Sequence, residues 1–311
     1  LTGGSLLDNV DDLELAFRIT LDDMNTLKVF GIGHTAARSW LVMDETAVSD
    51  MADRTVQPLI NGVNAMNAGA FVEDTTPPQL LSFDVSIDKS FVVLQFSETV
   101  KASTLKASEL TIHALNRATA TCVNQTACAA SNPPTSYRLQ YGSFTSSTDG
   151  SALIVSVDWD DLNELKFFQD LAVTATTTFL SFSGDMVTDM NDNTVVAVTQ
   201  DLDCPFACST LCECNYSFIQ ASSLESDETA PELSSFDFDA NGEGSIRFKF
   251  SEAVDELSLN TSYITLQVGF DSTAEAVMVV GASVVAISRH EVLVTLLPAD
   301  LNLIKFNRNL A

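Results

Sequence analysis

The sequence predicts an all-β protein built from tandem β-sandwich domains, each carrying one short inserted helix. Two observations predict this fold: landmark sequences return at a domain-sized interval, and short strand-like runs separated by turns lie between them. The clearest landmark has the form Asp-x-Asn-x-x-Lys and begins at Asp23, Asp161 and Asp300, with 138 residues from the first to the second and 139 from the second to the third. Such an interval is typical of whole domains rather than of the short units of a solenoid.

Three further landmarks divide the chain. They are an Asp-x-Thr stretch with proline at Asp74 and Asp227, Phe-Ser-Glu at Phe96 and Phe250, and Val-x-Asp-Met at Val48 and Val187. In this frame residues 1–73 are the second half of a repeat, residues 74–226 are a complete repeat, and residues 227–311 are an incomplete one. We therefore expect the 311 residues to be a segment of a longer chain of such repeats.

The middle repeat contains a series of strand-like runs. They cover residues 80–87, 91–96, 109–115, 137–141 and 152–159, followed after the helix by 178–183 and a last hairpin at 186–198. Leu153, Val155 and Val157 alternate as expected for a strand with one buried face, and a turn at Asp149-Gly150 precedes them. The number and spacing of the runs predict a β-sandwich of about seven short strands.

One helix interrupts this pattern at the Asp-x-Asn-x-x-Lys landmark. Asp160 or Asp161 is placed to cap it, and apolar residues recur at helical spacing over 162–168. Its polar residues allow two interpretations. In the structural one, Asp161 and Asn163 satisfy free N–H groups at the helix start and Lys166 pairs at the surface. In the other, the helix is a recognition element.

Composition limits the classes of partner. The net charge is −27, from 42 acidic and 15 basic residues, with 46% hydrophobic residues. Such a folded, very acidic chain is repelled by nucleic acid and by anionic membranes, so we expect neither as a partner. No run reaches the roughly 18 apolar residues of a membrane-spanning helix. The longest, from Ala276 to Ile287, is broken by Gly281 and predicts two strands and a turn.

All six cysteines lie in two insertions of the middle repeat, at Cys122, Cys128, Cys204, Cys208, Cys212 and Cys214. An even number fits a disulfide framework. We expect Cys122 to pair with Cys128, and the other four to pair among themselves in one of three ways. A zinc or iron–sulfur site is the alternative for the group of four, but zinc knuckles prefer Cys-x-x-Cys pairs, which are absent.

Three Asn-x-Ser/Thr sequons, at Asn124, Asn215 and Asn260, indicate N-linked glycans. Together with the cysteines they predict an extracellular protein. We expect no membrane contact from this segment. The linkers at 74–78 and 227–231 are short, acidic and stiffened by proline, which predicts that successive repeats form an extended rod.

The order Asp-Thr-Thr-Pro-Pro, Phe-Ser-Glu-x-Val and Val-Thr-Asp-Met-x-Asp-Asn resembles that of the Ig-like repeats of bacterial surface-layer proteins. The inserted Asp-x-Asn-x-x-Lys helix is similar instead to repeats of mastigoneme (flagellar hair) proteins and sexually induced surface glycoproteins of heterokont algae and their relatives. This resemblance covers nearly the whole chain. It implies tandem Ig-like sandwiches in a large secreted structural glycoprotein that assembles into filaments or coats at the cell surface or the flagellar surface. Its expected partners are copies of itself or other filament or coat proteins. The cysteine insertions depart from the general unit and leave the partner surfaces undefined.

The main alternative function is a cell-surface adhesion or mating receptor made of the same repeats, with the insertions as its ligand-binding face. An enzyme is not expected. The three histidines, His34, His113 and His290, lie at unrelated positions of the repeat, and no nucleophile elbow or phosphate loop accompanies them.

Calcium is the one cofactor that the residues suggest. Asp74, Glu98, Asp189, Asn191 and Asp192 supply hard oxygen ligands near linkers and loops, and extracellular calcium could offset the negative charge. The alternative is that these residues only form turns and cap a linker, because their spacing matches no dedicated calcium loop.

Overall fold

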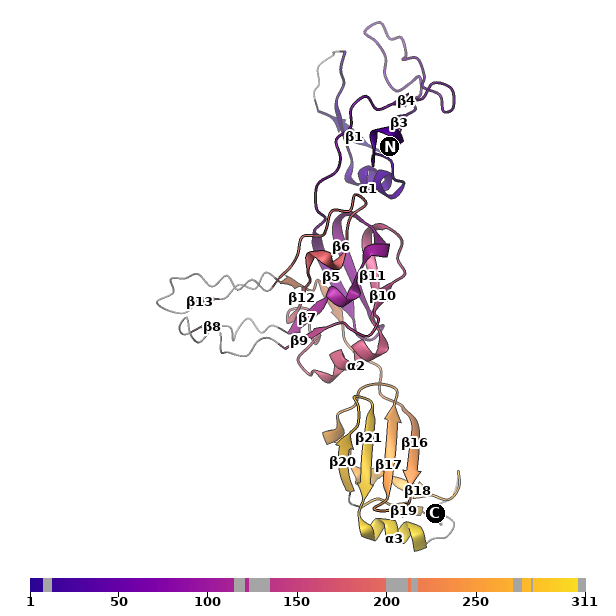
Figure 1. The fold of residues 1–311 in the computed structure, drawn as a ribbon, viewed down its shortest axis with the longest axis vertical. Helices are drawn as coiled ribbons and strands as arrows, with labels where there is room; N and C mark the ends of the chain where they lie inside the picture. Colours follow the sequence, from indigo (N-terminus) through magenta and orange to yellow (C-terminus); the bar gives the residue numbers. More distant parts are fainter. Residues whose placement is uncertain are drawn as a thin grey trace.

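The computed structural model describes residues 1–7, 13–114, 121–122, 135–199, 212–213, 218–270, 276–280 and 282–306. The expected all-β character is confirmed, since these residues form mainly strands in several sheets together with three short α-helices. The helices are α1 (Leu21–Val29), α2 (Trp159–Phe167) and α3 (Pro298–Phe306), one at each Asp-x-Asn-x-x-Lys landmark. The three repeats follow one another along the longest axis of the molecule (Figure 1).

In the middle repeat two sheets enclose one core. The first has the order β10 (Phe144–Thr145), β11 (Gly150–Ser156), β6 (Phe91–Val100), β5 (Leu80–Ser86) and β15 (Ser223–Glu225). The second has the order β14 (Ile219–Gln220), β12 (Thr178–Ser181), β7 (Thr111–Ala114) and β9 (Ser136–Arg138). Neighbouring strands are antiparallel except β15, which runs parallel to β5. Three short 3₁₀ helices connect strands, at Ala102–Thr104, Ala107–Glu109 and Gly184–Met186.

Alternation along β6 explains how this core forms. Val92, Leu94 and Phe96 are at most 2% exposed, because side chains two residues apart point to the same face of a strand. The hairpin from β5 to β6 turns through Ser90, a non-glycine residue at a φ of 58°. All residues of the buried cluster lie between Leu80 and Ala221, so the core of the middle repeat contains no residue from the other two.

The two insertions of the middle repeat meet in one antiparallel pair. β8 (Thr121–Cys122) pairs with β13 (Cys212–Glu213), and the register places the Cα of Cys122 opposite that of Cys212. The other four cysteines lie outside the described residues. The predicted disulfide pairings therefore remain predictions, and this register adds Cys212 as a neighbour of Cys122 along the backbone.

Helix α2 begins earlier than the sequence indicated. Its N-cap is Asp158, whose side chain accepts a hydrogen bond from the N–H of Asp160, so neither Asp160 nor Asp161 is the cap. The strand expected to run on to residue 159 ends at Ser156, because Trp159 already starts the helix. Asp158 has the extended backbone and short acceptor side chain that a cap requires.

The last repeat forms one larger sheet and one small one. The order of the larger sheet is β16 (Leu233–Asp239), β17 (Ser245–Phe250), β21 (Glu291–Leu296) and β20 (Ala282–Ala286). The small sheet pairs β18 (Thr265–Gln267) with β19 (Ala276–Met278). Two 3₁₀ helices lie at Glu256–Ser258 and Thr261–Tyr263. The expected two strands between 276 and 287 are present as β19 and β20, but they belong to different sheets.

The first repeat consists of short elements around α1. They are β1 (Gly4–Leu6), β2 (Phe17–Ile19), a 3₁₀ helix at Ala36–Arg38, β3 (Trp40–Leu41) and β4 (Met66–Asn67). Among its described residues the only buried one is Asp23, at 6% exposure. A buried carboxylate in a segment without a buried apolar core indicates that α1 is held by polar contacts.

Candidate functional site at the repeat junctions

In α1 and α2 the three polar residues of the Asp-x-Asn-x-x-Lys landmark divide their contacts between two repeats. In α2, Asp161 is fully buried and faces its own repeat. Its Oδ1 accepts hydrogen bonds from the Tyr137 hydroxyl and the Gln140 N–H, both at 2.8 Å, and its Oδ2 accepts one from the Ser143 hydroxyl at 2.7 Å. Asp161 thereby fastens the helix to the chain that follows β9.

The corresponding aspartates have the same role in the other two helices. Asp23 accepts hydrogen bonds from the N–H groups of Thr2 and Gly3, and Asp300 accepts one from the N–H of Val280 at 3.1 Å. Both carboxylates are buried, at 6% and 4% exposure. The first position of the landmark therefore anchors the helix within its own repeat in all three copies.

Asn163 and Lys166 reach across to the last repeat. The Oδ1 of Asn163 accepts a hydrogen bond from the N–H of Ala253 at 2.5 Å, while its Nδ2 donates to the carbonyl of Trp159 within the helix. The Nζ of Lys166 lies 2.9 Å from Asp227 Oδ2 and also forms an ion pair with Glu252. Asp227 belongs to the proline-containing linker, and Glu252 to the Phe-Ser-Glu landmark at the end of β17.

The first junction repeats these contacts residue by residue. Asn25 Oδ1 accepts a hydrogen bond from the N–H of Thr99 at 3.0 Å. Lys28 forms ion pairs with Glu98 and with Asp74, whose Oδ2 lies 2.6 Å from Nζ but outside hydrogen-bond geometry. Asn25, Lys28, Asp74 and Glu98 thus match Asn163, Lys166, Asp227 and Glu252. Three of the recurring landmarks meet in one place, which gives a physical reason for their recurrence.

The surroundings keep the two junction lysines charged. Burial alone would lower the pKa of Lys28 and of Lys166, but hydrogen bonds and attraction from the paired carboxylates raise both above the ordinary value for lysine. The pKa of Glu98 is raised, chiefly by burial and further by the nearby carboxylates of Asp74 and Asp189. Each junction lysine is therefore charged near neutral pH, whereas burial and the neighbouring carboxylates disfavour the charged form of Glu98.

The second junction contains additional contacts. Arg289 donates from Nε and Nη2 to the two carboxylate oxygens of Glu164, at 3.0 and 3.1 Å, and its guanidinium lies 3.4 Å from the ring centre of Phe167. The indole N–H of Trp159 donates to the carbonyl of Ser251 at 3.1 Å. Helix α1 has Leu21, Thr26 and Val29 at the positions of Trp159, Glu164 and Phe167, none of which can make these contacts.

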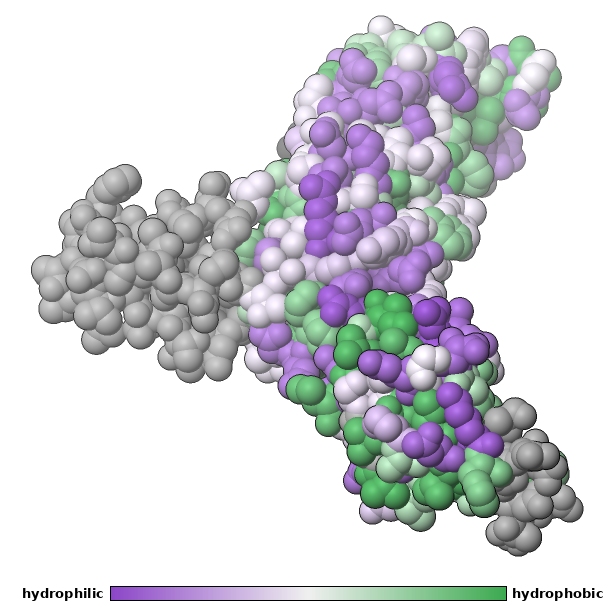
Figure 2. Space-filling model, turned by 60° about the horizontal axis from the view of Figure 1, so that its bottom comes forward, coloured by the Kyte–Doolittle hydropathy of each residue, from purple (hydrophilic) through white to green (hydrophobic). Residues whose placement is uncertain are grey.

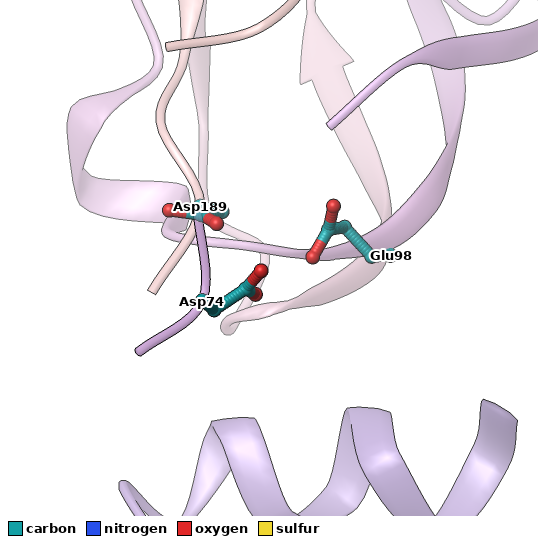
Figure 3. Close-up of side chains that lie close together, drawn as sticks. All are labelled: Asp74, Glu98 and Asp189. Atoms are coloured by element: carbon teal, nitrogen blue, oxygen red, sulfur yellow. The ribbon is translucent and has the colours of Figure 1, made fainter. Parts of the chain in front are cut away.

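The suggested calcium ligands are only partly brought together. Ligand atoms of Asp74, Glu98 and Asp189 lie within 4.8 Å of one another, and Figure 3 shows the three carboxylates gathered in one place. Two of them are already paired with Lys28. The Oδ1 of Asp189 accepts hydrogen bonds from the N–H groups of Asn191 and Asn193, as expected for the turn interpretation. A cation at this position would have to share the carboxylates with Lys28.

The side chains of the other two suggested ligands have partners of their own. Asp192 is exposed and lies 3.4 Å from Lys101, and Asn191 Oδ1 lies 3.2 Å from His34 Nδ1 of the first repeat. These contacts fit the interpretation of residues 189–193 as a turn whose side chains also touch the neighbouring repeat. Calcium binding itself remains a prediction.

The three histidines have different surroundings. His34 and His290 both lie at junctions, where His290 packs edge-on against Trp159 at 4.5 Å between ring centres. His113 is buried against Phe218, and burial lowers its pKa to about 4. Its Nε2 lies 2.7 Å from the hydroxyl of Ser181, but its Nδ1 has no hydrogen-bond partner among the described residues, so none of them supplies an acid that orients this pair. The geometry gives no support to a nucleophile there.

Of the three sequons, only Asn260 lies among the described residues. It is exposed and caps the 3₁₀ helix at Thr261–Tyr263, so its position is open to a glycan. Asn124 and Asn215 lie outside the described residues.

No helix in the described parts of the chain is long and apolar enough to cross a membrane. A comparison of the sequence with known protein families and with curated proteins finds no significant match.

Proposed function

We propose that this protein is a structural extracellular glycoprotein made of tandem Ig-like repeats, which assembles into a filament or coat such as a flagellar mastigoneme. The observation that carries the proposal is the junction itself. Two successive junctions use the same asparagine, lysine, aspartate and glutamate, in the same orientation along the chain. A connection that uses the same four residues each time joins successive repeats in a similar way, as a fibre or array requires.

The charge distribution supports the same function. With 42 acidic and 15 basic residues, neighbouring repeats repel one another except where a lysine is placed between them. Lys28 and Lys166 are among those few cations, and both lie at junctions with side chains that are 17% and 11% exposed. The attraction is therefore confined to the ends of the repeats, which favours an extended chain over a collapsed one.

Imaging of the native assembly tests the proposal. Antibodies against this chain should label a regular filament or coat at repeated positions. Single molecules on a membrane stalk would contradict it and favour the adhesion or mating receptor. Peptide mapping of the same material should find an N-linked glycan on Asn260, since that site is exposed. A cytosolic protein without glycans and with free thiols would exclude the extracellular assignment.

A further inference from the structure

Helix α3 carries the same connecting residues as α1 and α2 but without a partner. Asn302 and Lys305 occupy the positions of Asn163 and Lys166, and both are exposed. Neither has a hydrogen bond or an ion pair among the described residues. In the second junction, by contrast, Asn163 is 2% exposed and the Lys166 side chain 11% exposed.

The orientation of α3 is fixed in the same way as that of α2. Asp300 is bound to the N–H of Val280, and Leu301 and Ile304 are buried at 5% and 0% exposure. These are the positions of Asp161, Leu162 and Leu165, which are buried in α2. Because three anchoring positions agree, the polar face of α3 points away from its own repeat, as that of α2 does.

The apolar residues beside this face are exposed as well. Phe306, at the position of Phe167, is 88% exposed, and Leu303, at the position of Glu164, is 56% exposed. Phe167 is covered by Arg289 of the next repeat and is only 38% exposed. Figure 2, in which this end of the molecule is turned forward, shows apolar residues among polar ones on its surface.

We propose that the exposed face of α3, formed by Asn302, Lys305 and Phe306, binds the acceptor end of another repeat of the same kind. That end offers a linker aspartate, a strand-end glutamate and the free N–H of the next residue, as Asp227, Glu252 and Ala253 do for α2. The inference rests on the proposed function in one respect, because it takes the junction to be the contact that joins successive repeats along an array.

The charges on this face of α3, and the fact that one acceptor is already filled, indicate which partner the face binds. One ammonium beside an amide oxygen complements two carboxylates beside an N–H, and the remaining very acidic surface would repel other acidic proteins. The acceptor at Asp74 and Glu98 of the 311-residue chain is already filled by Lys28. Two copies of this chain should therefore not join through that acceptor, and a repeat with a free acceptor is needed.

A shortened chain, residues 70–311, provides such an acceptor together with α3. It should fold, because the core of the middle repeat is made only of residues 80–221. We expect it to associate head to tail at about 1 mM, a range in which weak single contacts are populated. A zero-length carbodiimide reagent should then join Lys305 to Asp74 or Glu98 of another molecule. The 311-residue chain, whose acceptor is filled by Lys28, should give no such product under the same conditions.

Single substitutions decide whether the association uses the proposed contacts. In the shortened chain Lys305→Ala or Glu98→Gln should weaken association by about tenfold or more, as measured by sedimentation. Lys249→Ala is the matched control, since it removes an exposed lysine of the same repeat that lies away from α3 and whose ion pair in the described part of the chain is with Glu291. Circular dichroism checks that each variant is folded.

The proposal is overturned if the shortened chain stays monomeric at that concentration, or if Lys305→Ala associates as well as its control. Both outcomes differ from a failure of the proposed function. Native protein found as single molecules on a membrane stalk would refute the filament while leaving the α3 contact intact. A native filament in which α3 contacts no other repeat would refute only this inference.

Discussion

The two junctions have the same residue type at four matching positions and differ in the residues around them. Both join asparagine to a backbone N–H and lysine to a linker aspartate and a strand-end glutamate. Only the second adds Arg289, which binds Glu164 and covers Phe167. The shared set therefore defines the connector, and the surrounding residues adjust how firmly each joint is held.

Burial follows the same difference. Asn163 is buried and Asn25 only partly so, and the side chain of Lys166 is 11% exposed against 17% for Lys28. Because ion pairs and hydrogen bonds strengthen as water is excluded, we expect the second junction to be the stiffer of the two.

The largest effect is expected from the anchoring aspartate. Asp161→Ala would leave the Tyr137 hydroxyl, the Gln140 N–H and the Ser143 hydroxyl without their acceptor. We expect the middle repeat to lose about 3 to 5 kcal/mol of unfolding free energy, as measured by denaturant unfolding. Asp160→Ala removes the exposed neighbour and should cost about 0.5 kcal/mol or less. Equal losses in both variants would show that Asp161 is no anchor.

Replacing the junction lysines should have the next largest effect and should distinguish the two junctions. Lys28→Ala and Lys166→Ala each leave a buried glutamate without its counter-charge, and Glu252 already has one carboxylate oxygen with no hydrogen-bond partner in the structure. We expect each change to weaken its junction by about 2 kcal/mol while both cores stay intact. Hydrogen exchange at the N–H groups of Thr99 and Ala253 measures each junction separately.

The second junction should retain more protection after its lysine is removed, because Arg289 still holds α2. If Thr99 and Ala253 lose protection equally, the additional contacts of the second junction contribute nothing to its stiffness.

Alkaline pH should loosen both junctions without any substitution. The pKa values of Lys28 and Lys166 are raised where these lysines are paired at the junctions, so the joined repeats bind more protons than separated repeats do. The stabilisation is therefore fully present below the ordinary lysine pKa of about 10.4 and is lost as pH rises through the raised values. Hydrogen exchange is too fast there, so scattering should be recorded from pH 8 to about pH 12. Lys28→Arg with Lys166→Arg is the control, because arginine keeps its charge over this range.

The smallest predicted effect isolates the feature that distinguishes the second junction. Arg289→Ala removes two hydrogen bonds to Glu164 and the contact with Phe167. We expect a loss of about 1 kcal/mol at the second junction and none at the first, since this arginine is partly exposed. Reduced protection at Thr99 in this variant would show that the two junctions are coupled.

The repeat and its strands could be predicted from sequence because both depend on local patterns. Alternation over Leu153 and Val155 and the turn at Asp149-Gly150 do mark β11. The cap of α2 was misplaced by two or three residues, because Asp158, Asp160 and Asp161 are equally good acceptors and only the fold decides which side chain faces the helix end.

The junction could not be predicted from one repeat alone. Nothing local indicates that Asn163 and Lys166 turn outward while Asp161 turns inward, since all three are polar. The signal that the sequence did contain was the joint recurrence of three landmarks, which is explained if they meet in the fold.

The burial of individual side chains could not be predicted for a similar reason. Phe83 and Phe236 occupy the same landmark position, but Phe83 lies between two sheets at 0% exposure and Phe236 is 52% exposed.

Small-angle X-ray scattering of the full chain tests most directly whether the junctions hold the repeats in line. Wild-type protein should scatter as an extended particle about as long as the three repeats placed end to end, as in Figure 1. The double variant Lys28→Ala with Lys166→Ala should keep its folded repeats but show a broader distribution of distances. A compact wild-type particle with a maximum dimension near that of one domain, or identical curves for the two proteins, would contradict the account.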